Sequence, residues 1–208
     1  MLHPDNQPDV AIAWDTLVLG IGNVLWADEG FGVRAVENLN SRFLFPDHTR
    51  LMDGGTQGIF LLPWVRSTKH LLIFDAIDFA LQPATLKVIR GDDVPRYMGA
   101  KKVSMHQAGF QEVLSSAQLS GEFPEELVLI GVQPALLDDY GGSLTEGVRG
   151  QIEPAVNIAC GVLSDWDVDF QPRPEPLTGD DRIGPGALDI GDYESGRPDV
   201  RGRLQGQQ

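Results

Sequence analysis

The chain has 208 residues and a formal net charge of −14 at pH 7, which excludes several classes of protein. So acidic a chain would be repelled by the phosphates of DNA or RNA and by anionic membrane surfaces. Apolar residues make up 42% of the sequence, and no run approaches the roughly 20 apolar residues that span a bilayer. The single cysteine, Cys160, excludes internal disulfides and cysteine-based zinc sites, so a cytoplasmic protein is expected.

Short apolar runs alternate with stretches of helical periodicity between residues 16 and 163. The runs predict strands at 16–20, 49–52, 70–74, 85–89 and 127–132, and the periodic stretches predict helices at 31–43, 59–65, 107–119 and 144–163. The strand at 70–74 is apolar at four consecutive positions, which is typical of a parallel sheet covered on both faces. This alternation predicts a three-layer α/β/α fold with a mostly parallel sheet.

The two ends of the chain differ in composition from this body. Residues 1–15 are polar and include two prolines, which predicts a flexible leader rather than a signal peptide. Residues 171–208 contain five prolines and seven glycines but few large apolar side chains. Such a stretch buries too little surface to offset its ordering entropy. We therefore expect a single α/β domain over 16–166 and a disordered tail over 167–208.

The loop after the first strand, residues 20–30, begins Gly-Ile-Gly and invites comparison with the dinucleotide-binding fingerprint. The third glycine of that fingerprint is replaced by Leu25, and the carboxylates of Asp28 and Glu29 would repel a pyrophosphate. An oxidoreductase with a nicotinamide or flavin cofactor is therefore disfavoured. One interpretation of the acidic pair is a helix N-cap that interacts with the helix dipole. In that case Glu29 remains available to point into a crevice.

Three further polar positions lie at the ends of predicted elements. Asp53 follows the second strand and precedes two glycines, so a turn or N-cap role and a functional role both stay open. Asp75 closes the apolar strand 70–74, where a carboxylate carries a desolvation cost unless it is paired or bound to a cation, and this favours function. His106 precedes the helix at 107–119, and a lone histidine is more often structural than a ligand.

Glu29, Asp75 and His106 are expected to converge, because open α/β sheets build their sites at the edge where parallel strands end. Two carboxylates and an imidazole would suit Ni²⁺, Zn²⁺, Mn²⁺ or Fe²⁺ with coordination positions left open, and they do not identify the metal. Other catalytic signatures are missing, since the sequence contains no Gly-x-Ser-x-Gly, no His-Glu-x-x-His and no P-loop.

Five segments, in this order, resemble the hydrogenase maturation endopeptidases. They are Leu19-Gly20-Ile21-Gly22-Asn23 with Asp28-Glu29-Gly30-Phe31-Gly32-Val33-Arg34; Asp53-Gly54-Gly55-Thr56; Asp75-Ala76; His106-Gln107; and Gly121-Glu122-Phe123-Pro124. The resemblance implies a twisted, mostly parallel five-stranded sheet between helices. It also implies an enzyme that cuts a short C-terminal extension from the precursor of the large subunit of nickel-iron hydrogenases, once nickel has been inserted.

Carried over by motif, the residues that contact the metal would be Glu29, Asp75 and His106. Asp53 would lie beside them, and the family is classed with the aspartic-type endopeptidases. Two mechanisms stay open. In the favoured one, the three side chains grip nickel already held by the precursor, and Asp53 is the catalytic carboxylate. In the other, the metal also acts as a Lewis acid and Asp53 or Asp75 is the general base.

Two alternatives remain open: one concerns the kind of function and the other the metal that the isolated protein holds. A non-catalytic maturation chaperone could sense nickel loading with the same three ligands and cut nothing. The isolated protein could also hold a different divalent metal, because the precursor would supply part of the coordination shell of nickel. Neither alternative is decided by the sequence.

Overall fold

The computed structural model describes residues 14–100, 105–175, 177, 181–184, 188 and 190–195. For residues 99, 100, 105–108, 192, 194 and 195 it describes the backbone and not the side chain. The predicted leader therefore lies outside the described residues, except for Trp14 and Asp15, which begin the first strand.

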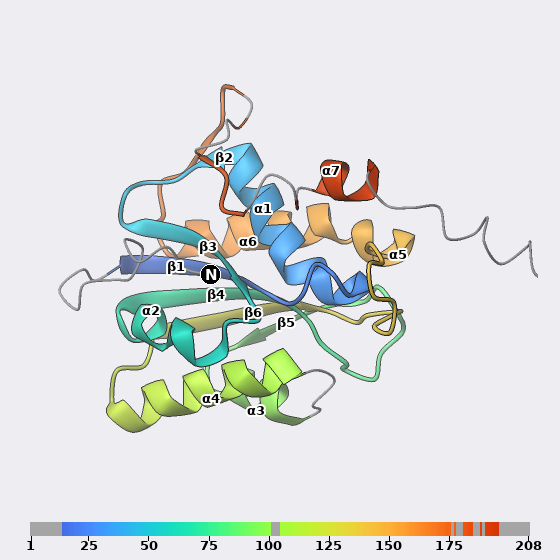
Figure 1. Cartoon of the computed structure of the whole chain (residues 1–208). Helices are drawn as coiled ribbons and strands as arrows, with labels where there is room; N and C mark the ends of the chain where they lie inside the picture. The colour runs from blue at the N-terminus through green and yellow to red at the C-terminus, as the bar shows by residue number, and fades with distance from the viewer. Residues whose placement is uncertain are drawn as a thin grey trace, which may run out of the picture.

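A five-stranded sheet forms the middle of the molecule, with the strands in the order β3-β1-β4-β6-β5 (Figure 1). The strands are β1 (Trp14–Ile21), β3 (Thr49–Gly55), β4 (Thr68–Ala76), β5 (Leu86–Arg90) and β6 (Glu126–Val132). Four of them run parallel, and β5 runs antiparallel to β6 at one edge. The predicted mostly parallel, five-stranded sheet is confirmed.

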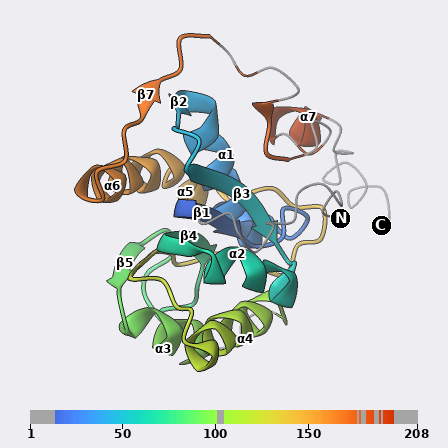
Figure 2. The ribbon, with the colours of Figure 1, turned by 90° about the vertical axis from the view of Figure 1, so that its left-hand side faces the viewer.

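Helices cover both faces of this sheet, as Figures 1 and 2 show. On one face lie α1 (Phe31–Arg42), α5 (Glu146–Arg149) and α6 (Ile152–Asp165), and on the other lie α2 (Leu62–Arg66), α3 (Asp93–Ala100) and α4 (Met105–Ser120). The described residues form one apolar core on each side of the sheet, so the three-layer fold is confirmed. Within the described ranges, no helix has both the length and the apolar character needed to cross a membrane.

Three helical stretches differ from the prediction. The predicted helix at 144–163 is two helices, α5 and α6, separated by a turn at Gly150 and Gln151, where glycine weakens a helix. The predicted helix at 59–65 begins as a 3₁₀ turn, η3 (Gly58–Leu61), and continues as α2. The helix α3 was not predicted, because it buries only the apolar pair Val94 and Met98 and gives too short a periodic signal.

The C-terminal segment, by which we mean the described residues from 171 onward, lies along α1 in Figures 1 and 2. Its strand β7 (Gln171–Pro172) pairs antiparallel with β2 (Phe43–Leu44), and α7 (Ile190–Ser195) follows. Just before it, the ring of Phe170 packs against Phe43 and Phe45. Composition predicted a disordered tail over 167–208, whereas the described part of that range makes specific contacts with the domain.

Candidate active site

The parallel strands β1, β3 and β4 end at one edge of the sheet, and two of the predicted site residues lie there. In the register of the sheet, Gly20 of β1 pairs with Asp53 of β3 on one side and with Phe74 of β4 on the other. Asp75 is the next residue of β4. The two aspartates therefore flank the end of β1, as predicted for strands whose C-terminal ends are neighbours.

Asp53 and Asp75 face opposite sides of the sheet. Side chains alternate along a strand, so Asp53 shares its side with Leu51, which belongs to the core under α1 and α6. Asp75 shares its side with Ile73, which belongs to the core under α2 and α4. The edge thus presents one carboxylate toward each helical layer, and a ligand that reaches both must cross the rim of the sheet.

Glu29 is carried to this edge by the tight loop between β1 and α1. Gly22 has a φ of 136°, a conformation that favours glycine, and a Cβ there would lie 1.8 Å from the carbonyl oxygen of Glu29. Gly32 lets α1 approach the strands closely, because a Cβ there would lie 2.2 Å from the carbonyl oxygens of Ile21 and Phe74. The chain just before α1, including Glu29, is therefore held against the end of β4.

Asp28 is fixed differently from its neighbour Glu29. Its buried carboxylate accepts hydrogen bonds from the backbone N–H groups of Ala135, Leu136 and Thr145 at 2.7–2.9 Å and from the Thr145 hydroxyl at 3.1 Å. No side chain caps the 3₁₀ turn η2 (Ala27–Gly30) or α1, so the predicted N-cap interpretation of Asp28 is wrong. The sequence could not reveal the true role, since the donors lie more than 100 residues away along the chain.

Glu29 is close enough to Asp75 to affect it electrostatically. Burial raises the pKa of Glu29 to about 7, and the negative charge of Asp138 raises it as well. Asp75 is fully buried, and this burial raises its pKa well above the usual range. A hydrogen bond from the N–H of Ala76 lowers that pKa, whereas the neighbouring Glu29 carboxylate raises it. The pair therefore favours a proton or a cation over two bare negative charges.

His106 lies in the first turn of α4, but its side chain is outside the described residues. The position of its backbone is informative. Gly109, one turn further along α4, approaches Gly58, which follows β3 at the same edge of the sheet. Since α4 also covers the face on which Asp75 lies, the start of α4 is at the same edge and on the same face of the sheet as Asp75. Among the described side chains, no cluster of three potential metal ligands is present, and that set does not include His106.

Asp53 has a separate environment on the α1 side of the edge. Burial raises the pKa of Asp53, while the backbone N–H of Gly55 and the positive charge of Arg34 lower it. Arg34 is itself buried on α1 and forms an ion pair with Glu37 at 2.8 Å. Sequence analysis did not single out Arg34. The available signal was a charged residue on the apolar side of a predicted helix, three residues after Phe31.

Comparison with known proteins identifies the family. The family model described as hydrogenase maturation protease (HycI) matches residues 33–162. The hydrogenase expression/formation protein HoxM of Azotobacter vinelandii is 56% identical over 183 residues, which cover 88% of this chain and 86% of that protein. A match of that length cannot end before residue 183, so it includes part of the C-terminal segment.

Two matches from Escherichia coli connect the chain to a named activity and to a solved structure. The hydrogenase 2 maturation protease of strain K12 is 42% identical over 158 residues, which cover 76% of this chain and 95% of that protein. The structure of the E. coli hydrogenase maturating endopeptidase HybD matches with a TM-score of 0.72 and 41% identity, over 76% of this chain and 97% of that one. Fold and matches together define a peptidase with a three-layer α/β architecture. The chain belongs to the hydrogenase maturation protease family.

Proposed function

We propose that this protein removes the C-terminal extension of the large-subunit precursor of a nickel-iron hydrogenase after nickel insertion. Glu29, Asp75 and His106 recognise the nickel that the precursor carries, and Asp53 is the catalytic carboxylate of an aspartic-type reaction. The single observation that best supports this proposal is the pairing of Glu29 with the fully buried Asp75 at the edge of the sheet.

The carboxylate pair supports cation recognition for an electrostatic reason. Two carboxylates in a partly desolvated site repel each other, and a bound divalent cation replaces that repulsion with attraction. Without the cation, the two carboxylates form no attractive interaction with the precursor, so a precursor that lacks nickel would bind weakly. In this scheme nickel is part of the substrate, and its other ligands come from the precursor. His106 would add a nitrogen ligand from the start of α4.

Asp53 suits a catalytic role because it stands at the same edge but on the other side of the sheet. A precursor whose nickel is held beside Asp75 would cross the end of β1 near Gly20 to reach Asp53. There an ionised Asp53 would accept a proton from the water that attacks the scissile carbonyl. The alternative scheme assigns that proton to Asp75 and uses the metal as a Lewis acid. The two schemes differ in whether Asp53 is required.

The decisive experiment incubates the purified full chain with purified, nickel-loaded precursor and weighs the products by mass spectrometry. We expect one cleavage near the C-terminus of the precursor, and no cleavage of precursor that lacks nickel. Glu29→Gln, Asp75→Asn and His106→Ala should each slow cleavage at least about 100-fold, as expected when one ligand of a shared metal is lost. Glu112→Gln, an exposed glutamate on α4, is the matched control and should cleave normally. Normal cleavage by all three site variants would refute the site.

Asp53→Asn separates chemistry from recognition. If Asp53 is the catalytic carboxylate, this variant still binds nickel-loaded precursor in a pull-down assay but does not cut it. Full activity of Asp53→Asn would favour the scheme in which Asp75 is the base. If the wild-type chain binds the loaded precursor and leaves its mass unchanged under all conditions, the protein is a nickel-sensing chaperone instead.

A further inference from the structure

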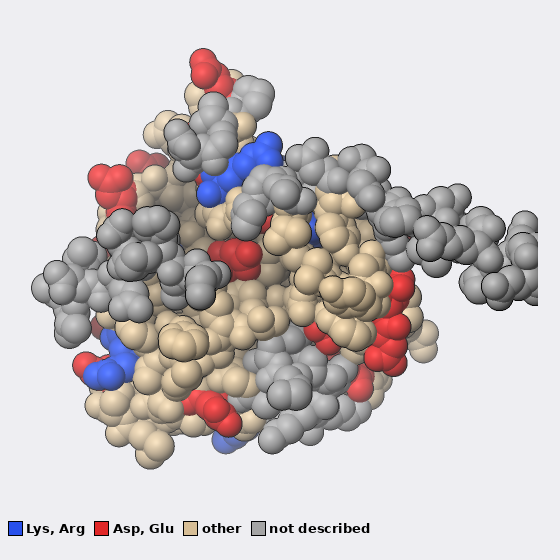
Figure 3. Space-filling view, in the orientation of Figure 1, with Lys and Arg blue, Asp and Glu red and all other residues tan. Residues whose placement is uncertain are grey.

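The C-terminal segment is tied to α1 at points well separated along the helix. The side-chain amide of Asn40 donates a hydrogen bond of 2.9 Å to the carbonyl oxygen of Asp181. Two turns closer to the start of the helix, Nη1 of Arg34 donates to the carbonyl oxygen of Leu188. On the face shown in Figure 3, a group of basic side chains lies above a group of acidic side chains in the upper half of the molecule. The segment therefore covers the side of α1 that leads toward Asp53.

Arg34 is the most deeply buried of these contacts. Its side chain is only 4% exposed, its Nη1 lies 2.8 Å from Oε2 of Glu37, and its guanidinium lies 5.9 Å from the ring centre of Tyr193. Its Nη2 is buried and has no hydrogen-bond partner among the described residues. The guanidinium is thus fixed from two directions, by α1 and by the C-terminal segment, and its Nη2 amino group has no partner among the described residues.

Asp53 lies against the same group of side chains. A Cβ on Gly184 of the C-terminal segment would lie 3.2 Å from Oε1 of Glu37 and 3.8 Å from Oδ2 of Asp53, so both carboxylates approach one point. The other oxygen of Asp53, Oδ1, is buried and has no well-formed hydrogen bond among the described residues. The positive charge of Arg34 lowers the pKa of Asp53 and so opposes the effect of burial.

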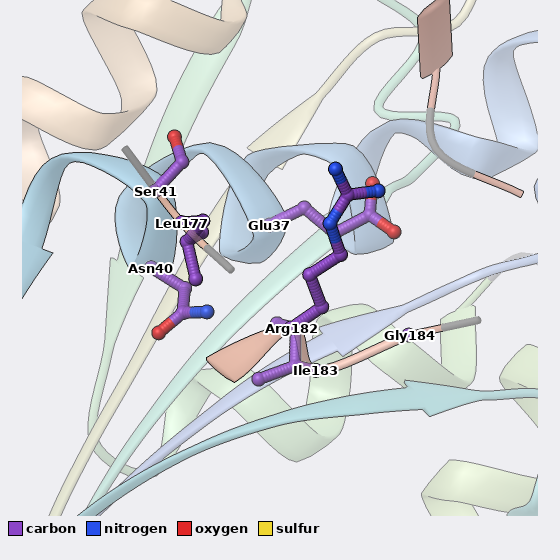
Figure 4. A pocket seen from close by; sticks show the side chains of 7 residues that line it. All are labelled: Glu37, Asn40, Ser41, Leu177, Arg182, Ile183 and Gly184. Carbon is purple, nitrogen blue, oxygen red and sulfur yellow. The ribbon is translucent and has the colours of Figure 1, made fainter. Parts of the chain in front are cut away.

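A cavity of about 110 Å³ lies between α1 and the C-terminal segment, beside these carboxylates (Figure 4). Glu37 lines it from α1, and Arg182 and Gly184 line it from the C-terminal segment. In Figure 4 the side chain of Arg182 extends toward Glu37. Among the described residues, the charged groups on this side of Asp53 are therefore Arg34, its ion-pair partner Glu37 and, further out, Arg182.

We propose that Arg34 is a positioning residue for the Asp53 carboxylate, and that Leu188 and Tyr193 hold Arg34 in place, so that the C-terminal segment is part of the active site. This inference rests on the proposed function, in which Asp53 is the catalytic carboxylate. A mostly buried carboxyl group tends to keep its proton, and a protonated Asp53 cannot accept one from water. A guanidinium remains charged at any working pH, and a nearby positive charge favours the ionised form of the carboxyl group.

The first test measures the ionisation of Asp53 directly, without a substrate. The full chain is labelled with ¹³C-carboxyl aspartate, the Asp53 signal is assigned by its loss in Asp53→Asn, and its pKa is measured by NMR. Arg34→Gln should raise this pKa by about one unit, and Arg34→Lys should restore most of the difference. Tyr193→Ala should give a smaller rise, and Tyr193→Phe, which keeps the ring, should give none. Arg90→Gln, an exposed arginine on β5, is the control.

The second test follows cleavage of nickel-loaded precursor against pH with the same variants. The acid limb of the profile should move to higher pH by the same amount as the pKa of Asp53, so that activity is lost on the acid side of the profile and kept on its basic side. A purely structural role would lower the melting temperature and leave the limb in place. Tyr193→Ala leaves α1 unchanged, and it alone decides the question if Arg34→Gln does not fold.

The outcomes separate this inference from the proposed function. An Asp53 pKa that is the same in Arg34→Gln, Tyr193→Ala and the wild type overturns the inference. A pKa that moves while the acid limb does not also overturns it, because Arg34 then does not act on the reaction. If the wild-type chain cuts no precursor, the proposed function fails, and the NMR titration still decides whether the C-terminal segment holds Arg34 where its charge lowers the pKa of Asp53.

Discussion

Asp28 and Asp75 are both completely buried near the same edge of the sheet, yet their surroundings are opposite. The Asp28 carboxylate accepts four hydrogen bonds from the loop that contains Ala135 and Thr145. The Asp75 carboxylate accepts a hydrogen bond from the N–H of the next residue, Ala76, and faces the negative charge of Glu29. Burial alone therefore does not distinguish a structural carboxylate from a functional one. The neighbouring groups do, because Asp28 is surrounded by hydrogen-bond donors and Asp75 lies near a negative charge.

The difference has a simple energetic meaning. The donors around Asp28 satisfy the oxygens of its buried carboxyl group, so this side chain stabilises the protein. The second carboxylate beside Asp75 makes the ionised pair a local cost to folding. Natural proteins commonly accept such a cost at functional sites. If the comparison is correct, removing the two buried aspartates should change stability in opposite directions.

The largest expected effect is the loss of the Asp28 anchor. Asp28→Ala leaves three backbone N–H groups and a hydroxyl without their acceptor, and it should lower the free energy of unfolding by about 4 kcal/mol. Asp28→Asn keeps the shape and one oxygen, and it should lose roughly half as much. Urea unfolding monitored by circular dichroism measures both values, with exposed Asp47→Asn as the control. A loss below about 1 kcal/mol in Asp28→Ala would contradict the role of Asp28 as an anchor.

The next effect has the opposite sign. At pH 8, Asp75→Asn should raise the free energy of unfolding by about 1–2 kcal/mol, because it removes a buried charge that faces Glu29. The gain should shrink as the pH falls, since a carboxyl group with a raised pKa takes up its proton at a higher pH and then carries no charge. The same variant should lose processing of nickel-loaded precursor. An Asp75→Asn protein that is less stable than the wild type at pH 8 would end the comparison with Asp28.

The sequence predicted the layers of the fold and the edge at which the site lies, because apolar periodicity directly encodes buried strands and helix faces. It also predicted that Glu29, Asp75 and His106 contact a metal. The structure places Glu29 near Asp75, and the role of the three residues stays a prediction. It could not predict that Asp28 binds residues 135–145, that α5 and α6 are separate, or that Arg34 meets Leu188. Each of these depends on contacts between distant parts of the chain, which leave no periodic signal.

The smallest expected effect tests the coupling between Glu29 and Asp75. The pKa of Glu29 is raised to about 7 in the folded protein, so the folded state binds more protons than the unfolded one between pH 4.5 and 7. The stability of the wild type should therefore fall across this range. Glu29→Gln should remove the part of this decrease that comes from Glu29. After allowance for the partial exposure of Glu29, the variant should have a free energy of unfolding about 1 kcal/mol higher than the wild type above pH 7 and the same as the wild type at pH 4.

Unfolding curves measured with chelator at several pH values test this effect, with Glu112→Gln as the matched exposed control. In the Asp75→Asn background the gain in stability from Glu29→Gln should be smaller, because Asp75→Asn has already removed the repulsion between the two carboxylates in the folded protein. Equal gains in the two backgrounds would mean that the carboxylates do not interact. In that case the pairing that supports nickel recognition would be lost, while the anchor at Asp28 and the family assignment would be unaffected.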